Sequence, residues 1–392
     1  MVLLLVLVLI IPYGLRGQEH EPIRVDDDQE LLQLAQQEGW PGSGTEEDPI
    51  VIEGLDIRPE RGPGIYLGNV SFWVLVKECS VEGASPQDDR FFRGAGILLY
   101  NSSHVRILDC SLRGNDEGVY AKFSTFTVED SNIEGSDSGG IVSYGSEFTV
   151  ENTTLSDNDV GVDALQSMTE VVNCVIRGSH DGVYASGGNV VVRGSRITDV
   201  ESSGIELYEV DGPLIEENYI EGGHEGIGLY RSSNGTIANN TVIGGFFGIF
   251  LFKSKGNLVV GNWVEGCEEG ISVDYHGNGN EIVLNALVGN GYGVVLHSDT
   301  SGNLVHRNAF VHNAGSGDHY DPAHVQALDS SGHNLWNDSE MGNYWRDWAM
   351  NNDTNDGDGD GIVDYPYRIE GYGIDYLPLK ESPVEEIPEF EL

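Results

Sequence analysis

The sequence predicts an all-β protein: a right-handed, single-stranded parallel β-helix of about 11–12 coils, with a helix capping its N-terminal end and a second cap at its C-terminal end. Three observations predict this fold. A glycine-led motif recurs about every 22 residues, apolar residues alternate over short runs between polar turns, and small or amide side chains recur at one point of each repeat. Repeats of this length cannot bury a core alone, so they stack into a solenoid.

The recurring motif is a glycine followed by an aliphatic residue, any residue, a small or aliphatic residue and any residue. An early copy at Gly64 lies 32 residues before Gly96, and the surplus fits an insertion around residues 85–93. From Gly96 onward, successive copies lie 21–23 residues apart, too regular a spacing for chance. These copies begin at Gly96, Gly118, Gly140, Gly161, Gly182, Gly204, Gly226, Gly248, Gly270 and Gly293.

Each repeat is expected to contain three short strands and three turns. Apolar residues alternate within a repeat, as they do in strands, and no helical spacing of apolar residues is sustained. Three strands and three turns use about 22 residues, so one repeat makes one coil, and successive coils lie about 4.8 Å apart. The stacked coils would extend over roughly 50 Å.

Columns of small and amide residues support the same stacking. Side chains at one turn can hydrogen-bond to the backbone and to each other, which satisfies buried polar groups. The first column runs through Cys79, Cys110, Ser131, Thr153, Cys174, Ser195, Asn218, Asn240, Asn262, Asn285 and Asn308. A second column contains Asn257, Asn280, Asn303 and Asn334. Cysteines in such a column are small buried residues, although Cys79 and Cys110 would lie on adjacent coils, close enough to permit a disulfide.

The open ends of a β-helix expose strand edges and need covers. Residues 28–38 predict a short amphipathic helix that plugs the first coil with Leu31, Leu32, Leu34 and Ala35. At the other end, the bulky residues of a cap are Asn343, Tyr344, Trp345 and Trp348. The expected organisation is a signal peptide (1–17), an N-terminal capping segment (18–48), the β-helix (49–335), the C-terminal cap (336–380) and an acidic tail (381–392).

Charge and hydropathy restrict the partners and the location. The formal net charge is −44, and clustered Lys and Arg are absent, which excludes nucleic acid and anionic membranes as partners. The surplus of acid also suits a high-salt milieu. Residues 2–11 are apolar, too few to cross a bilayer but suited to a signal-peptide core. We therefore expect an extracytoplasmic protein (secreted, periplasmic or on the cell surface) without an integral membrane span in the mature chain.

An Asp-rich segment predicts a calcium loop in the C-terminal cap. Carboxylates at alternate positions next to a glycine that permits a sharp turn can converge on one hard cation. The four predicted ligands are Asp356, Asp358, Asp360 and Asp364. Position twelve is Tyr367 where an EF-hand has Glu, so we expect a structural ion in a solenoid cap; the alternative is a solvated acidic turn.

Aromatic residues recur on the outward side of the glycine-led strand, at the second and fourth positions after each glycine. Flat, amphipathic rings in a row can bind sugars or partner proteins, or can simply stabilise the sheet by stacking. Tyr66 and Tyr100 occupy such positions in the early coils. The predicted ligand-binding set is Tyr120, Tyr144, Tyr184, Tyr208, Tyr230, Phe250 and Phe252.

Two further clusters are candidates for chemistry. Asp163 and Glu206 share one outward column two coils apart, roughly 9.6 Å by strand spacing, near the upper edge of the separation in inverting glycosidases. Tyr184 lies between them, and an acidic chain produces such pairs by accident. At one edge of the sheet, a possible transition-metal site combines two aspartates with two histidines, which otherwise form ordinary surface hydrogen bonds: Asp274, His276, His297 and Asp299.

Residues 39–380 resemble the NosD-like family of periplasmic copper-binding β-helix proteins and, more broadly, carbohydrate-binding and sugar-hydrolase β-helix repeats. The resemblance rests on Gly39 to Thr45 with residues 48–53 at the start, and on residues 342–345, 358–362, 366–367 and 375–379 at the end. It implies an extracytoplasmic location and, for the founding member, a part in delivering copper to a periplasmic reductase.

Three functions remain open at this point. The first is a non-catalytic surface or secreted protein whose aromatic face binds a glycan or another envelope component. The second is a NosD-type accessory protein that handles copper or another transition metal. The third is a polysaccharide hydrolase, lyase or epimerase.

Overall fold

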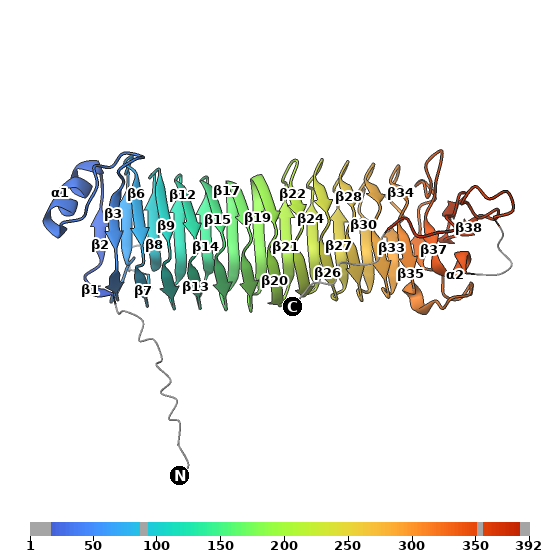
Figure 1. Ribbon diagram of the computed structural model, residues 1–392, viewed down its shortest axis with the longest axis horizontal. Coiled ribbons are helices and arrows are strands. Elements are labelled where there is room, and N and C mark those ends of the chain that lie inside the picture. Colours follow the sequence, from blue (N-terminus) through green and yellow to red (C-terminus); the bar gives the residue numbers. More distant parts are fainter. Residues whose placement is uncertain (1–16, 87–92, 351–355, 385–392) are drawn as a thin grey trace, which may run out of the picture.

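The computed structural model describes residues 17–86, 93–350 and 356–384. In these ranges the chain forms a long parallel β-helix of about 12 turns (Figure 1). The predicted signal peptide lies, except for Gly17, outside the described residues, as do residues 385–392 of the predicted tail. No helix in the described ranges is long and apolar enough to cross a membrane.

The first strand of each coil runs parallel to its neighbours above and below, and we call these strands glycine-led because most of them contain or directly follow the repeated glycine. The strand of the first coil has Pro22 in place of the glycine. β17 and β19 continue past the next corner and so also form the second strand of their coils. The glycine-led strands are β2 (Ile23–Val25), β5 (Ile65–Gly68), β8 (Ala95–Tyr100), β11 (Glu117–Lys122), β14 (Gly139–Tyr144), β17 (Val160–Val172), β19 (Asp181–Arg193), β21 (Ser203–Tyr208), β24 (Glu225–Tyr230), β27 (Phe247–Phe252), β30 (Glu269–Asp274) and β33 (Tyr292–Leu296), followed in the stack by β36 (Ala327–Asp329) and β39 (Glu370–Gly371).

The second and third strands of each coil build two further faces. The second strands join the glycine-led strands in one 24-stranded sheet through β17 and β19. They are β3 (Ile50–Glu53), β6 (Val74–Lys77), β9 (Val105–Leu108), β12 (Thr125–Glu129), β15 (Glu147–Glu151), β22 (Leu214–Glu216), β25 (Thr236–Ala238), β28 (Leu258–Val260), β31 (Glu281–Val283) and β34 (Leu304–His306). The third strands form a separate 14-stranded sheet: β1 (Gln18–His20), β4 (Leu55–Ile57), β7 (Ser80–Glu82), β10 (Ser111–Arg113), β13 (Asn132–Glu134), β16 (Thr154–Ser156), β18 (Val175–Arg177), β20 (Arg196–Val200), β23 (Tyr219–Gly222), β26 (Thr241–Ile243), β29 (Trp263–Glu265), β32 (Ala286–Val288), β35 (Ala309–Val311) and β37 (Tyr344–Trp345).

The interior is apolar and lined by the predicted columns. Alternate strand residues such as Ile205 and Ile227 are completely buried, because each face of the solenoid turns every second side chain inward. In the first column the amide oxygen of each asparagine accepts from the asparagine one coil earlier, and the run from Asn218 continues past Asn308 to Asn343. The structure thus confirms the predicted column and extends it into the cap.

A third interior column was not predicted. Asn290 accepts from the backbone N–H of Cys267, and Asn313 accepts in turn from Asn290. Gln326 closes this column by accepting from the Asn313 backbone. All four cysteines are buried and free, so the structure contains no disulfide between Cys79 and Cys110.

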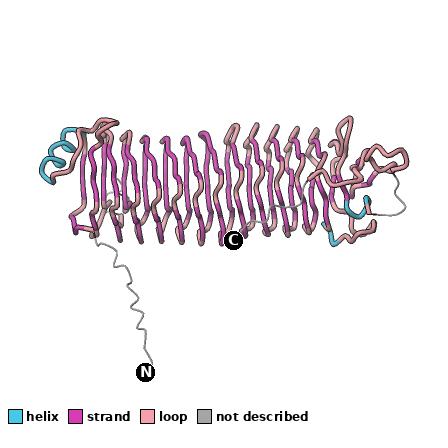
Figure 2. The backbone as a smooth tube through the Cα atoms, in the orientation of Figure 1, coloured by secondary structure: helices cyan, strands magenta, loops and turns pink. Residues whose placement is uncertain are grey.

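Helices lie only at the two ends of the described solenoid (Figure 2). α1 (Asp28–Glu38) has the predicted bounds, and Asp27 caps it by accepting from the Glu30 backbone N–H at 2.8 Å. Leu31 and Ala35 are buried against the first coils, whereas Leu32, also predicted to face the core, is exposed.

The C-terminal cap is built on stacked aromatic rings. Trp345 is buried between Phe310, at 4.0 Å between ring centroids, and Tyr367, at 4.1 Å. Its indole N–H donates to Asp375, whose burial raises its pKa to about 6. The remaining elements of this end are η1 (Asn313–Gly315), α2 (Arg346–Ala349) and the antiparallel pair β38 (Tyr367–Arg368) and β40 (Ile374–Asp375).

Candidate functional site

The outward side of the glycine-led strands, which we name the glycine-strand face, presents three side chains per coil. They are the residue before the glycine and the second and fourth residues after it. Strand pairing places Asp163 opposite Tyr184, and Tyr184 opposite Glu206. The predicted column is therefore present, with its two carboxyl groups on the first and third of three adjacent coils.

Aromatic rings form a continuous row along this face. The Tyr184 ring lies 6.1 Å from that of Tyr208, and Tyr208 stacks on Tyr230 at 4.6 Å with the ring planes 6° apart. The row continues from Tyr230 to Phe252 at 5.7 Å and from Phe252 to Tyr275 at 5.3 Å. Tyr184, Tyr208, Tyr230 and Phe252 are half-buried and Tyr275 is exposed, so the row offers an edge and ring surface to solvent.

Two other predicted rings are exposed or half-exposed, but they lie two and three coils before the start of this row. Tyr120 lies under the Arg93 guanidinium, at 4.6 Å from the ring centroid. Tyr144 is 41% exposed and packs edge-on against Phe123.

Phe250 corrects the expectation of an exposed platform. Only 7% of Phe250 is exposed, because the Phe247 ring stacks on it at 4.3 Å and Tyr230 packs against its edge. Tyr66 is also buried. These two rings stabilise the sheet by packing and are not available to a ligand.

Four acidic residues on this face were missed: Glu117, Asp181, Glu225 and Glu269. Each lies directly before the repeated glycine, at a position that belongs to the strand. Only positions after the glycine were considered in the sequence, so this position was left out. The sequence signal was present, because this outward position carries Asp181, Ser203 and Glu225 in three successive coils.

Asp181 and Glu206 belong to one chain of hydrogen bonds. His180 contacts one Asp181 oxygen at 3.1 Å, and the other oxygen accepts from the Ser203 backbone N–H at 3.0 Å. The Ser203 hydroxyl donates to Glu206 at 3.0 Å. These contacts fix the orientation of both carboxyl groups beside the tyrosine row.

Glu225 is held at the next coil. The Tyr230 hydroxyl donates to one of its oxygens at 2.5 Å, while the other oxygen is buried without a hydrogen-bond partner. Gly228 makes room for it, since a Cβ there would lie 2.4 Å from that second oxygen. An orphaned buried oxygen is unusual in a native protein and calls for an explanation, of which a bound donor is one.

Burial raises the pKa of three carboxyl groups beside the tyrosine row. Desolvation is the largest cause of the raised pKa at Asp163, Glu206 and Glu225, and nearby like charges add to it at Glu206. One oxygen of Asp163 is also buried without a partner. Carboxyl groups that keep their protons more readily can donate hydrogen bonds or act as general acids.

The predicted transition-metal cluster does not converge. His276 contacts Asp299 at 3.9 Å, but His297 is directed back to Glu269 at 3.6 Å and to Ser272. Tyr275 and His276 both have positive φ, 49° and 66°. The chain therefore turns directly after Asp274, so Asp274 and His276 do not lie on one straight strand edge as the repeat spacing had predicted.

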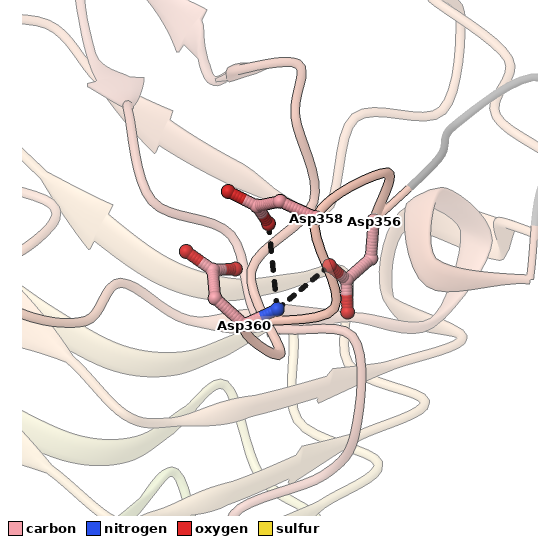
Figure 3. A group of neighbouring side chains, drawn as sticks. All are labelled: Asp356, Asp358 and Asp360. Atoms are coloured by element: carbon pink, nitrogen blue, oxygen red, sulfur yellow. Dashed lines mark hydrogen bonds between the residues drawn. The ribbon is translucent and has the colours of Figure 1, made fainter.

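The Asp-rich loop does gather carboxylates. In the described parts of the chain, Asp356, Asp358 and Asp360 are the one group of three or more His, Cys, Asp or Glu residues with ligand atoms within 4.8 Å of one another (Figure 3). Asp356 also accepts from the backbone N–H groups of Gly359 and Gly361, which fixes the turn. Asp364, the fourth predicted ligand, accepts from the Gly357 backbone instead.

Copper does not fit the soft donors that the structure describes. The four thiols are buried in the interior columns, where Cys79, Cys110 and Cys174 each contact backbone carbonyls. Met168, Met341 and Met350 are exposed and lie on separate parts of the solenoid and cap. Copper prefers imidazole, thiolate or thioether ligands that meet at one point, which these residues do not do.

Comparison with known proteins agrees with the fold. Residues 164–349 match the family described as periplasmic copper-binding protein (NosD), and residues 42–173 match the right-handed β-helix region. The A-module of the mannuronan C-5 epimerase AlgE4 from Azotobacter vinelandii is similar in structure, with 15% identity, a TM-score of 0.50 and coverage of 80% of this chain and 90% of the other. A double mutant of the periplasmic alginate epimerase AlgG gives 16% identity, a TM-score of 0.50 and coverage of 80% and 84%. No curated protein matches the sequence.

Proposed function

We propose that this chain, a right-handed β-helix protein with NosD-type repeats, is an extracytoplasmic protein that binds a glycan along its glycine-strand face. The observation that carries the proposal is the contiguous row from Tyr184 to Tyr275 beside carboxyl groups with unpartnered buried oxygens. Rings of this kind stack on the apolar faces of sugars, and carboxyl groups accept from sugar hydroxyls.

Charge indicates a glycan that is neutral or carries amino groups. Asp163, Asp181, Glu206 and Glu225 lie on the glycine-strand face of β17, β19, β21 and β24, and no outward position of that face in these four strands holds Lys or Arg. With a net charge of −44, the protein would repel a polyuronate. The carboxylate-rich substrates named for the two similar epimerases are therefore poor candidates here.

Glycan-array binding with matched variants tests this proposal. Replacing Tyr184 and Tyr208 together by alanine removes two neighbouring rings, and we expect at least a tenfold loss of affinity for the glycans bound by the unaltered protein. Tyr219→Ala is the control, because Tyr219 lies on the separate third-strand sheet, where its hydroxyl donates a hydrogen bond to Glu221. If no glycan binds, or if the double variant and the control bind alike, the proposal is wrong.

A second candidate function is glycoside hydrolysis with Asp163 and Glu206. It is favoured by their placement on one column two coils apart and by the raised pKa of both groups. An inverting reaction would need one protonated carboxyl to protonate the leaving oxygen and one carboxylate to activate water. Asp163→Asn would then abolish turnover of a bound glycan while binding persists; turnover that survives this change excludes the pair.

The Asp-rich loop supports calcium as a structural ion. Asp356, Asp358 and Asp360 supply the hard oxygen ligands. The ion would fix the loop next to Ile362, which pairs with Leu379 and so joins the loop to the cap. This role is separate from the glycine-strand face and does not depend on it.

A further inference from the structure

A pocket of about 470 Å³ lies on the second-strand face near the N-terminal end, away from the glycine-strand face. Its floor is formed by outward residues of β6, β9 and β12, and Glu46 and Pro49 of the preceding loop close one side. That loop is fixed by its backbone, since the Trp73 N–H donates to Gly44 at 3.0 Å. Pockets of this size and shape are typical of small-ligand sites.

One wall of the pocket is a pair of stacked aromatic rings. The rings of Trp73 and His104 lie 4.4 Å apart with their planes at 22°. His104 has a positive φ of 58°, and its ring contacts the Ser71 carbonyl oxygen at 3.3 Å. The wall is therefore rigid before any ligand binds, which lowers the entropy lost on binding.

The floor carries an ordered polar group. Arg106 donates twice to Glu129, at 2.9 and 2.5 Å, and the Thr127 hydroxyl donates to the same carboxylate at 3.1 Å. A bidentate pair of this kind has a fixed geometry and leaves further donors and acceptors at its edges. Its position beside an aromatic wall gives the pocket both an apolar surface and directed polar groups.

We propose that this pocket binds a single neutral sugar unit, as a site separate from the glycine-strand face. The Trp73–His104 wall would pack on the apolar face of the ring, and Arg106, Thr127 and Glu129 would bond its hydroxyl groups. Glu46 and Glu129 disfavour an anion, and a wholly apolar ligand would cover the remaining donors and acceptors of the floor without bonding them.

Tryptophan fluorescence on the full chain tests the site, with cellohexaose, mannohexaose and N-acetylchitohexaose as probes. At least one probe should change the emission saturably, and Trp73→Ala should weaken that binding at least tenfold. Thr127→Val, which is close to isosteric, should weaken it severalfold without unfolding the protein. Trp263→Ala is the control, because Trp263 lies on the separate third-strand sheet, where its indole N–H donates a hydrogen bond to Glu265.

A further variant separates this site from the proposed function. In the protein with both Tyr184→Ala and Tyr208→Ala, binding at the pocket should be unchanged, so failure on one face does not count against the other. No saturable change with any probe, or equal affinity in the Trp73→Ala, Thr127→Val and control proteins, would overturn the proposal.

Discussion

The asparagine run of the first interior column and the glycine-strand face come from the same repeat, yet their polar groups are bonded in opposite ways. Inside, each stacked asparagine from Asn218 to Asn308 is bonded to the backbone and to the next coil. Outside, Asp163 and Glu225 each keep a buried oxygen without a partner. Stacked asparagines therefore satisfy each other completely, whereas the interior hydroxyls of Ser136 and Ser179 have no partner and these two outward carboxyl oxygens have none within the protein. Of these groups, only those on the outward face are places to look for a ligand.

Breaking the interior column should have the largest effect. The Asn262 amide donates to Ile237 and Asn285 and accepts twice from Asn240, all at 2.9 Å. Asn262→Ala removes these bonds and orphans their partners, so we expect the free energy of unfolding to fall by about 4 kcal/mol. Urea denaturation measures it. Asn189→Ala, at an exposed strand position, should change it by less than about 0.5 kcal/mol, and equal effects would contradict the comparison.

The outward carboxyl groups should make stability depend on pH. Burial raises the pKa of Glu117 to about 7, despite its contact with Arg93. Between about pH 4.5 and 7 the folded protein keeps a proton that the unfolded chain has lost. Stability is therefore greatest below this window and falls as pH rises through it, by about 3 kcal/mol at most. Glu117→Gln should flatten the profile.

Urea denaturation across this pH range provides the measurement for Glu117. The control is Glu129→Gln, which also removes an arginine partner, here Arg106. Its profile should keep the slope of the unaltered protein. If Glu117→Gln and the control have the same slope, another group is responsible.

The Asp-rich loop is a third case, because its outward carboxylates would be paired by a bound cation and not by other side chains. Saturating calcium at about 100 times its Kd should stabilise the cap by about 2.7 kcal/mol, and a chelator should lower the Tm of the cap accordingly. Asp358→Ala should abolish this sensitivity. A chelator that leaves the melting curve unchanged would exclude a structural ion.

The smallest effect is expected at a position of the first interior column where different coils already carry different small residues. Cys174 occupies the position that Ser131 and Ser195 hold in other coils, and its thiol contacts the carbonyl oxygens of Val150 and Val172. Cys174→Ser should therefore change the free energy of unfolding by less than about 1 kcal/mol. A loss of several kcal/mol would show that the column requires the larger sulfur atom at this coil.

The sequence was sufficient for the parts of the molecule that repeat. The period predicted the strand register, the first asparagine column and the neighbourhood of Tyr208 and Tyr230, and the amphipathic pattern predicted the bounds of the helix at residues 28–38. These features depend on local spacing, which a linear pattern contains.

What the sequence could not supply depends on side-chain direction and turn geometry. Burial of Phe250 requires knowing that Phe247 folds over it, and the split between His276 and His297 requires the positive φ angles of the turn. The acidic residues Asp181 and Glu225 were missed for a simpler reason, because the strand begins one residue before the glycine.

The continuous amide column gives the solenoid modular length. Asn240 and Asn262 are equivalent positions one coil apart, and each coil contacts mainly its two neighbours. Removing residues 241–262 would rejoin equivalent backbone and leave both end caps in place. The aromatic row would become one ring shorter, so the length of this row is set by how many coils the chain contains.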